Sequence, residues 1–113
     1  MTNILLTGTT GFVGAAVMKR LIIDGYEVTA AVRNQQSSVH SKVQMIIVPG
    51  LDAGTEWSAA LAGRDVAIHA AARVHVMSEQ SADPLAEFRK VNVEGTLNLA
   101  RQAAAAGIKR FVF

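Results

Sequence analysis

The chain has 113 residues, enough for one domain with a buried core, and half of them are hydrophobic. No apolar run approaches the roughly 18 residues that span a bilayer, which excludes a transmembrane helix and indicates a soluble protein. The formal net charge is only +2 and the basic residues are scattered, so a nucleic-acid-binding surface is not expected. The N-terminus lacks the pattern of a signal peptide, and the absence of cysteine excludes thiolate metal sites and fits the cytoplasm.

Short aliphatic runs alternate with helical patterns along the chain. The predicted strands are 3–7, 27–33, 43–48, 65–70 and 109–113, and the predicted helices are 12–24, 55–62 and 84–106. Because the runs are apolar on both faces and are separated by helices, we expect a parallel sheet covered on both sides. Right-handed crossovers then predict an α/β fold of Rossmann type, with about five strands in the order 3-2-1-4-5 and helices on both faces.

Glycine and proline mark the ends of the predicted helices. A left-handed C-cap favours glycine, and the sequence places one just past each helical pattern, at Gly25, Gly63 and Gly107. Asp83 and Pro84 supply an N-cap acid and a first-turn proline for the last helix. The polar segment 34–42 is predicted to be a loop or a weak helix at the edge of the sheet.

The most informative segment is Thr7–Gly14, between the first predicted strand and the first predicted helix. It contains Gly8, Gly11 and Gly14. In a strand, glycine loop and helix arrangement, bare backbone N–H groups at the helix N-terminus face an anion, and the missing Cβ atoms allow a pyrophosphate to approach closely. No Gly-Lys-Ser/Thr follows, which excludes a Walker-type loop. The segment therefore predicts a dinucleotide site.

Two further segments carry a signal. Small residues, Ala70–Ala72, lie at the carboxyl end of the fourth predicted strand, where a cofactor can lie against backbone. His69 has no second ligand at metal spacing, and we interpret it as a hydrogen-bonded core histidine. In the last helix, Asn92 lies on an apolar face that it shares with Phe88, Thr96, Leu99 and Ala103. Asn92 either ties the helix to backbone near the fourth strand, which we favour because a buried amide needs a partner, or points to solvent.

The segments Thr7-Gly-x-x-Gly-Phe-x-Gly14, Asp65-x-x-Ile-His-x-Ala-Ala72 and Asn92-Val-x-Gly-Thr-x-Asn-Leu99 resemble three signatures of the extended short-chain dehydrogenase/reductases, the NAD-dependent epimerase/dehydratase family. Members of that family act mostly on nucleotide-sugars, by hydride transfer to and from a tightly held nicotinamide. The resemblance implies that Asn92 supports the site and that Ala70, Ala71 and Ala72 line the cofactor near its ribose. It implies that the pyrophosphate is held by Gly8, Thr10, Gly11, Phe12, Val13 and Gly14.

The adenine side departs from that family. Leu51 and Asp52 lie where the family has an acid-aliphatic pair against adenine, here with the order scrambled. At the end of the second predicted strand, a carboxylate normally binds the ribose 2′-OH of NAD, but this chain has Arg33 and no acid. A guanidinium can pair with a 2′-phosphate, so NADP is favoured over NAD as the NAD(P) cofactor. The alternative is a solvated Arg33 that tolerates either.

The family's chemistry needs residues that this chain lacks. These are a Ser or Thr beyond the fifth strand and a Tyr-x-x-x-Lys pair, in which lysine lowers the tyrosine pKa. The only tyrosine, Tyr26, has Ala30 four residues later, so we assign no catalytic residue and expect the chain alone to be inactive. Arg73, His75 and Met77 either approach the substrate or line a loop without chemistry.

We therefore interpret residues 1–113 as the NAD(P)-binding domain at the N-terminal end of a longer enzyme, because an apolar strand, 111–113, closes the sequence. The enzyme would be a nucleotide-sugar epimerase, dehydratase or 4-keto reductase. One alternative is an NADP-dependent reductase of non-nucleotide carbonyls, and another is a non-catalytic NAD(P)-binding regulator. The apolar 84–106 helix further suggests a homodimer, and neither nucleic acid nor a membrane is expected as a partner.

Overall fold

The computed structural model describes residues 2–34, 40–71 and 84–113. Its strands coincide with the predicted runs to within one or two residues, and its helices share their starting regions but not all their lengths. The elements in chain order are β1 (Asn3–Thr7), α1 (Phe12–Ile23), β2 (Glu27–Val32), β3 (Gln44–Ile47), α2 (Ser58–Leu61), β4 (Val66–His69), α3 (Pro84–Arg89), a π-helical segment η1 (Lys90–Gly95), α4 (Thr96–Ala105) and β5 (Arg110–Val112).

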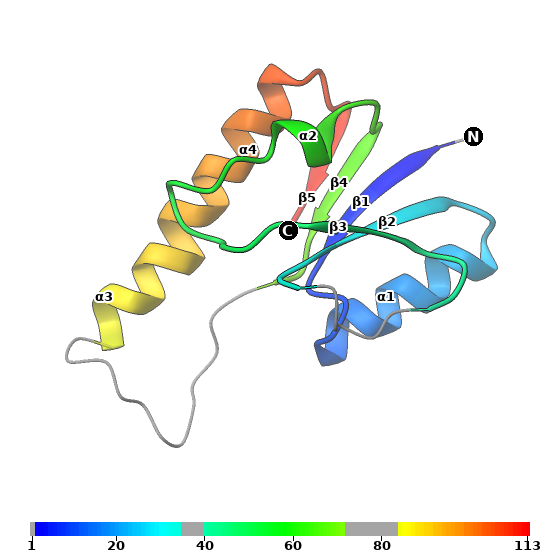
Figure 1. The fold of residues 1–113 in the computed structure, drawn as a ribbon, viewed down its shortest axis with the longest axis horizontal. Helices are drawn as coiled ribbons and strands as arrows, with labels where there is room; N and C mark the ends of the chain where they lie inside the picture. Colours follow the sequence, from blue (N-terminus) through cyan, green and yellow to red (C-terminus); the bar gives the residue numbers. More distant parts are fainter. Residues whose placement is uncertain (1, 35–39, 72–83) are drawn as a thin grey trace.

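The five strands form one parallel sheet in the order β3-β2-β1-β4-β5. Helix α1 covers one face, and α2 lies with α4 on the other (Figure 1). The predicted fold class, strand order and two-sided covering are confirmed. The carboxyl ends of β1, β2 and β4 consequently meet at one edge of the sheet, where open α/β sheets bind their ligands.

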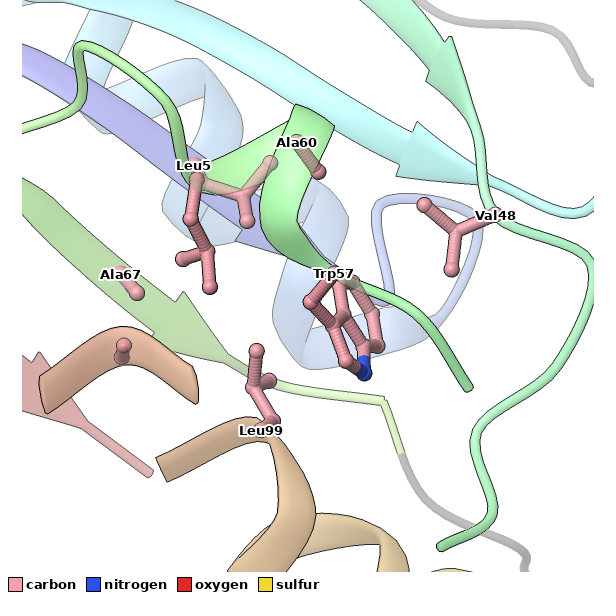
Figure 2. Packing of buried hydrophobic residues seen from close by; sticks show 8 residues of the cluster. Leu5, Val48, Trp57, Ala60, Ala67 and Leu99 are labelled. Carbon is pink, nitrogen blue, oxygen red and sulfur yellow. The ribbon is translucent and has the colours of Figure 1, made fainter. Parts of the chain in front are cut away.

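Adjacent residues of β1 supply both layers of the core. Leu5 packs with Trp57, Leu61 and Leu99 under α2 and α4 (Figure 2). Leu6 packs on the opposite side with residues of α1 and β2, among them Met18. This alternation is the reason that the strand reads as a continuous apolar run: both of its faces are buried.

The predicted glycine C-caps are confirmed, since Gly25, Gly63 and Gly107 all have positive φ. Pro84 begins α3 as predicted, whereas Asp83 lies outside the described residues. Residues 35–39 of the polar segment also lie outside them. No helix within the described residues is long and apolar enough to cross a membrane.

The last helical region differs from the single regular helix that the sequence predicts. Residues 90–95 form a π-helical stretch, which has more residues per turn than an α-helix. The residues before α4 that face the core therefore differ from those expected for a regular α-helix. Leu99 and Ala103 are buried as predicted, but the next buried residue is Gly95, and Asn92 is exposed. Asn92 is thus not buried with Leu99 and Ala103, because the wider turn breaks the regular 3.6-residue spacing, and its exposure matches the alternative in which it lies at the edge of the stripe toward solvent.

Gly95 explains why this region packs so closely. A Cβ on Gly95 would lie 1.6 Å from the carbonyl oxygen of Leu51, so only glycine lets the helix backbone meet the loop that follows β3. The same loop makes α2 shorter than predicted. Thr55 and Trp57 hydrogen-bond through their backbone to side chains of α4, and α2 starts only at Ser58.

Candidate functional site

A cleft of about 850 Å³ opens at the carboxyl end of the sheet. It lies between the loop after β1, the ends of β2 and β4, and the segment after β3. The described residues that line it are Thr7, Gly8, Thr9, Thr10, Gly11, Phe12, Val13, Gly14, Ala31, Val32, Arg33, Asn34, Val48, Pro49, Gly50, Leu51, Trp57, Ala70, Ala71 and Val91. The structure therefore brings together ten of the thirteen residues that the sequence predicts for the site.

Two glycines of the β1–α1 loop are required by the fold itself. Gly8 has a φ of 79°, and its Cβ would lie 2.6 Å from the backbone of both Ala70 and Ala71. A Cβ on Gly14 would lie 1.8 Å from the carbonyl oxygen of Gly8. These contacts lock the loop between the end of β4 and the first turn of α1.

Gly11 differs from the other two glycines of the loop. A Cβ there would meet only the Gly8 carbonyl oxygen, at 3.4 Å, which is an ordinary contact. Gly11 is exposed and precedes α1 as its N-cap, with no side-chain capping bond within the described structure and no acid in the first turn. The N–H groups of this first turn have no acceptor in the helix, and the dipole makes this end positive. The loop therefore fits a phosphate group, with Gly11 leaving the approach open.

Thr7 joins the loop to β4 through its hydroxyl. Its Oγ1 accepts a hydrogen bond from the Ala71 N–H at 3.1 Å and lies 2.7 Å from Nδ1 of His69. Thr7 is 1% exposed and His69 is 8% exposed. His69 is thus a buried, hydrogen-bonded histidine, as the sequence indicated. Burial lowers the pKa of its imidazole and so favours the neutral ring.

Among the described residues that line the cleft, the one charged side chain lies at the end of β2. Arg33 follows the last residue of β2 and lies beside Asn34 at the cleft wall. No carboxylate occurs among the described residues that line the cleft. An arginine in an acid-free wall suits an additional phosphate better than a ribose hydroxyl.

The segment after β3 separates two residues that the sequence grouped. Leu51 lines the cleft, but Asp52 does not. The Asp52 carboxylate instead accepts hydrogen bonds from the Gly54 N–H at 2.9 Å and from the Thr55 hydroxyl at 3.4 Å, which closes the loop on itself. The sequence does carry a signal for this role, because an Asp with Gly two residues later and Thr three residues later is typical of a turn.

The helical region contributes Val91 rather than Asn92 to the cleft wall. Sequence reasoning also missed Thr7, Thr9 and Trp57 as lining residues. Trp57 is the only tryptophan of the chain and could have been noticed as a large apolar residue within a polar stretch. Ala72, Arg73, His75 and Met77 lie outside the described residues.

His69 gives a pH-dependent prediction for stability. Its pKa is lowered in the fold, so below about pH 6.5 the unfolded chain binds more protons than the folded one. The free energy of unfolding should therefore fall as the pH drops from about 6.5 toward 5. Urea titrations across this range, followed by circular dichroism, should show a shallower dependence for His69→Gln.

Exposed His40 provides the matched control. His40→Gln, which removes an exposed ring and leaves His69 in place, should retain the wild-type dependence of the free energy of unfolding on pH. If the free energy of unfolding of His69→Gln depended on pH as that of the wild type does, the pH dependence would not arise from His69.

Comparison with known proteins shows the family of the chain. The model of the NAD dependent epimerase/dehydratase family matches residues 4–113. A UDP-glucose 4-epimerase of Vibrio cholerae is 42% identical over 113 residues, which cover 98% of this chain and 34% of the relative. A 3-beta-hydroxysteroid dehydrogenase of Mycolicibacterium neoaurum is 36% identical over 116 residues, covering 98% of this chain and 31% of that protein. The chain thus spans about a third of the length of these relatives.

Solved structures show the same fold. A short-chain dehydrogenase/reductase superfamily protein from Agrobacterium tumefaciens, solved with bound NAD, is 33% identical with a TM-score of 0.73, over 98% of this chain and 31% of that one. A UDP-galactose 4-epimerase is 28% identical with a TM-score of 0.77, over 99% of this chain and 37% of that one. The chain belongs to the NAD dependent epimerase/dehydratase family and is the NAD(P)-binding portion of a protein of that family.

Proposed function

We propose that the cleft holds the pyrophosphate of NAD(P) against the N-terminus of α1. The observation that carries this proposal is that Gly11 is exposed. A side chain at this position would fit the fold, so packing does not explain why the residue is glycine. The proposed pyrophosphate contacts are those that the sequence indicated, Gly8, Thr10, Gly11, Phe12, Val13 and Gly14, and all six line the cleft.

The remaining contacts follow from the geometry of the wall. We assign Arg33 and Leu51 to the adenosine side, and Ala70 and Ala71, together with Ala72, to the ribose. Asp52 and Asn92 do not line the cleft, so we assign them supporting roles, Asp52 by closing its loop. Arg33 is the charged residue of the wall, and we propose NADP as the preferred cofactor.

We propose that the whole protein is a nucleoside-diphosphate-sugar epimerase, dehydratase or 4-keto reductase. The 42% identity to a UDP-glucose 4-epimerase supports this class. The bound nicotinamide would supply hydride transfer, while the residues of this chain bind and orient the cofactor. We assign no catalytic residue to the chain, and we expect it to be inactive by itself.

Two alternatives remain distinct proposals. Arg33 and the 36% identity to a 3-beta-hydroxysteroid dehydrogenase favour an NADP-dependent reductase of non-nucleotide carbonyls. A non-catalytic NAD(P)-binding regulator would have the same cleft. Assays of the whole protein with UDP-glucose, with a steroid ketone and with cofactor alone separate the three, and turnover of UDP-glucose supports the leading proposal.

Substitution of the loop glycines tests the phosphate contact. Gly11→Ala should change the free energy of unfolding by no more than about 1 kcal/mol, the range for an N-cap exchange, yet weaken binding of NADP at least tenfold by obstructing the anion. Isothermal titration calorimetry and urea unfolding measure the two effects separately.

Gly14→Ala serves as the contrasting variant. Its Cβ would lie 1.8 Å from the Gly8 carbonyl oxygen. Overpacking of this kind costs about 1–3 kcal/mol, so this variant should lose stability as well as binding. Wild-type affinity in Gly11→Ala would show that no phosphate lies there.

The choice between NADP and NAD is tested at Arg33. Arg33→Ala should weaken binding of NADP by about 10-fold to 100-fold, the range for a lost hydrogen bond to a charged group, and leave binding of NAD nearly unchanged. Arg101→Ala, which removes an exposed arginine away from the cleft, is the control and should bind both as the wild type does. Equal affinity of Arg33→Ala and wild type for NADP would refute the 2′-phosphate contact.

We also propose that the protein forms a homodimer through residues 84–106. Val93 and Leu97 lie four residues apart on this helical region and are 52% and 48% exposed. Leu97→Glu should convert a dimer to a monomer in sedimentation equilibrium, because it would place a charge in an apolar contact. A monomeric wild-type protein at micromolar concentration would count against the proposal.

A further inference from the structure

Two side-chain amides of α4 hold the loop that forms one wall of the cleft. This loop runs from Pro49 to Trp57 and supplies Pro49, Gly50, Leu51 and Trp57 to the lining. Its own bonds are few within the described structure. The Thr55 N–H donates to the Asp52 carbonyl at 3.3 Å, and the remaining internal bonds involve the Asp52 and Glu56 carboxylates. The position of the loop over the cleft must therefore be set by contacts from elsewhere.

Asn98 and Gln102 supply the hydrogen bonds among those contacts, beside the packing of Trp57 in the core. Nδ2 of Asn98 donates to the carbonyl oxygens of Thr55 at 2.8 Å and Asp52 at 3.2 Å. Nε2 of Gln102 donates to the Thr55 carbonyl oxygen at 2.9 Å, and Oε1 of Gln102 accepts from the backbone N–H of Trp57 at 2.7 Å. Nε2 of Gln102 also donates to Oδ1 of Asn98 at 2.8 Å.

Every polar atom of the two amides is used in this arrangement. A carboxylate at position 102 could accept from the Trp57 N–H but would place a second acceptor against the Thr55 carbonyl and Oδ1 of Asn98. An aliphatic side chain would leave the Trp57 N–H and one bond to Thr55 unmet. The site thus specifies an amide by its hydrogen-bonding pattern, not only by its size.

We propose that Asn98 and Gln102 are positioning residues for the adenosine side of the cofactor. Neither lines the cleft, so they act through Leu51 and Trp57, which do. Gly95 adds a backbone contact to Leu51 from the same helical region. The proposal rests on the proposed NAD(P) function, because it assigns what this wall does for that ligand.

The test uses NADP binding by the 113-residue chain. Gln102→Leu keeps a similar volume and should weaken NADP binding about tenfold, a typical coupling for residues that share a hydrogen-bonded network. Affinity is measured by titration calorimetry at a temperature where circular dichroism shows both proteins folded, so that lost stability alone does not change it. Arg101→Leu, an exposed neighbour on the same helix, is the matched control and should bind as the wild type does.

A double-mutant cycle shows whether Gln102 acts through the loop. Leu51→Ala should weaken binding by itself, and in that background Gln102→Leu should have little further effect. Trp57, the single tryptophan, supplies a second readout: its 1% exposure should rise in Gln102→Leu, and its fluorescence emission should shift to longer wavelength.

Gln102→Glu supplies the conservative rescue. A protonated glutamic acid is both donor and acceptor, so the ratio of its Kd to the wild-type Kd should fall as the pH is lowered from 7.5 to 5. Unchanged NADP affinity in Gln102→Leu, or additive effects in the cycle, would overturn the positioning role while leaving the proposed function intact. Failure of the wild-type chain to bind either NADP or NAD would instead overturn the proposed function, and this inference with it.

Discussion

The site depends on a backbone contact at Gly8. The Gly8 Cα lies against the backbone of Ala70 and Ala71, and its carbonyl oxygen lies against the Cα of Gly14. Three segments, the loop after β1, the first turn of α1 and the end of β4, therefore meet without any side chain between them. Because peptide groups are stiffer than side chains, this contact fixes the direction of α1 and points its N-terminus into the cleft.

A second backbone contact fixes the opposite wall. Gly95 meets the Leu51 carbonyl, and the amides of Asn98 and Gln102 add hydrogen bonds to the same loop. The two walls are thus held by separate elements: one by α1 and β4, the other by α4. Arg33, at the end of β2, lines the same cleft as the residues of both walls. The loop after β1 and the segment after β3 are therefore supported by different elements.

Much of the fold could be predicted from the sequence, because the inner strands β1 and β2 are buried on both faces and therefore appear as continuous apolar runs. Residues 8–14 were found for a related reason, since strand, glycines and helix are contiguous in the chain. The errors arose where a local departure from regular structure decided which side chain faces the cleft. Asn92 was assigned to the buried stripe on regular helical spacing, but the π-helical turn at 90–95 moved that face to Gly95 and Val91. Asp52 was grouped with Leu51, yet its carboxylate is used within its own loop.

The sequence by itself determined the strand order, the position of the glycine loop and the family, because each depends on local periodicity or on residues that are neighbours in the chain. Only the tertiary structure decided which residues of the loop after β3 face the cleft and what holds them. Asn98 and Gln102 lie more than forty positions from the groups that they bind. No local pattern encodes such a contact, because it exists only once the sheet has brought α4 beside the loop.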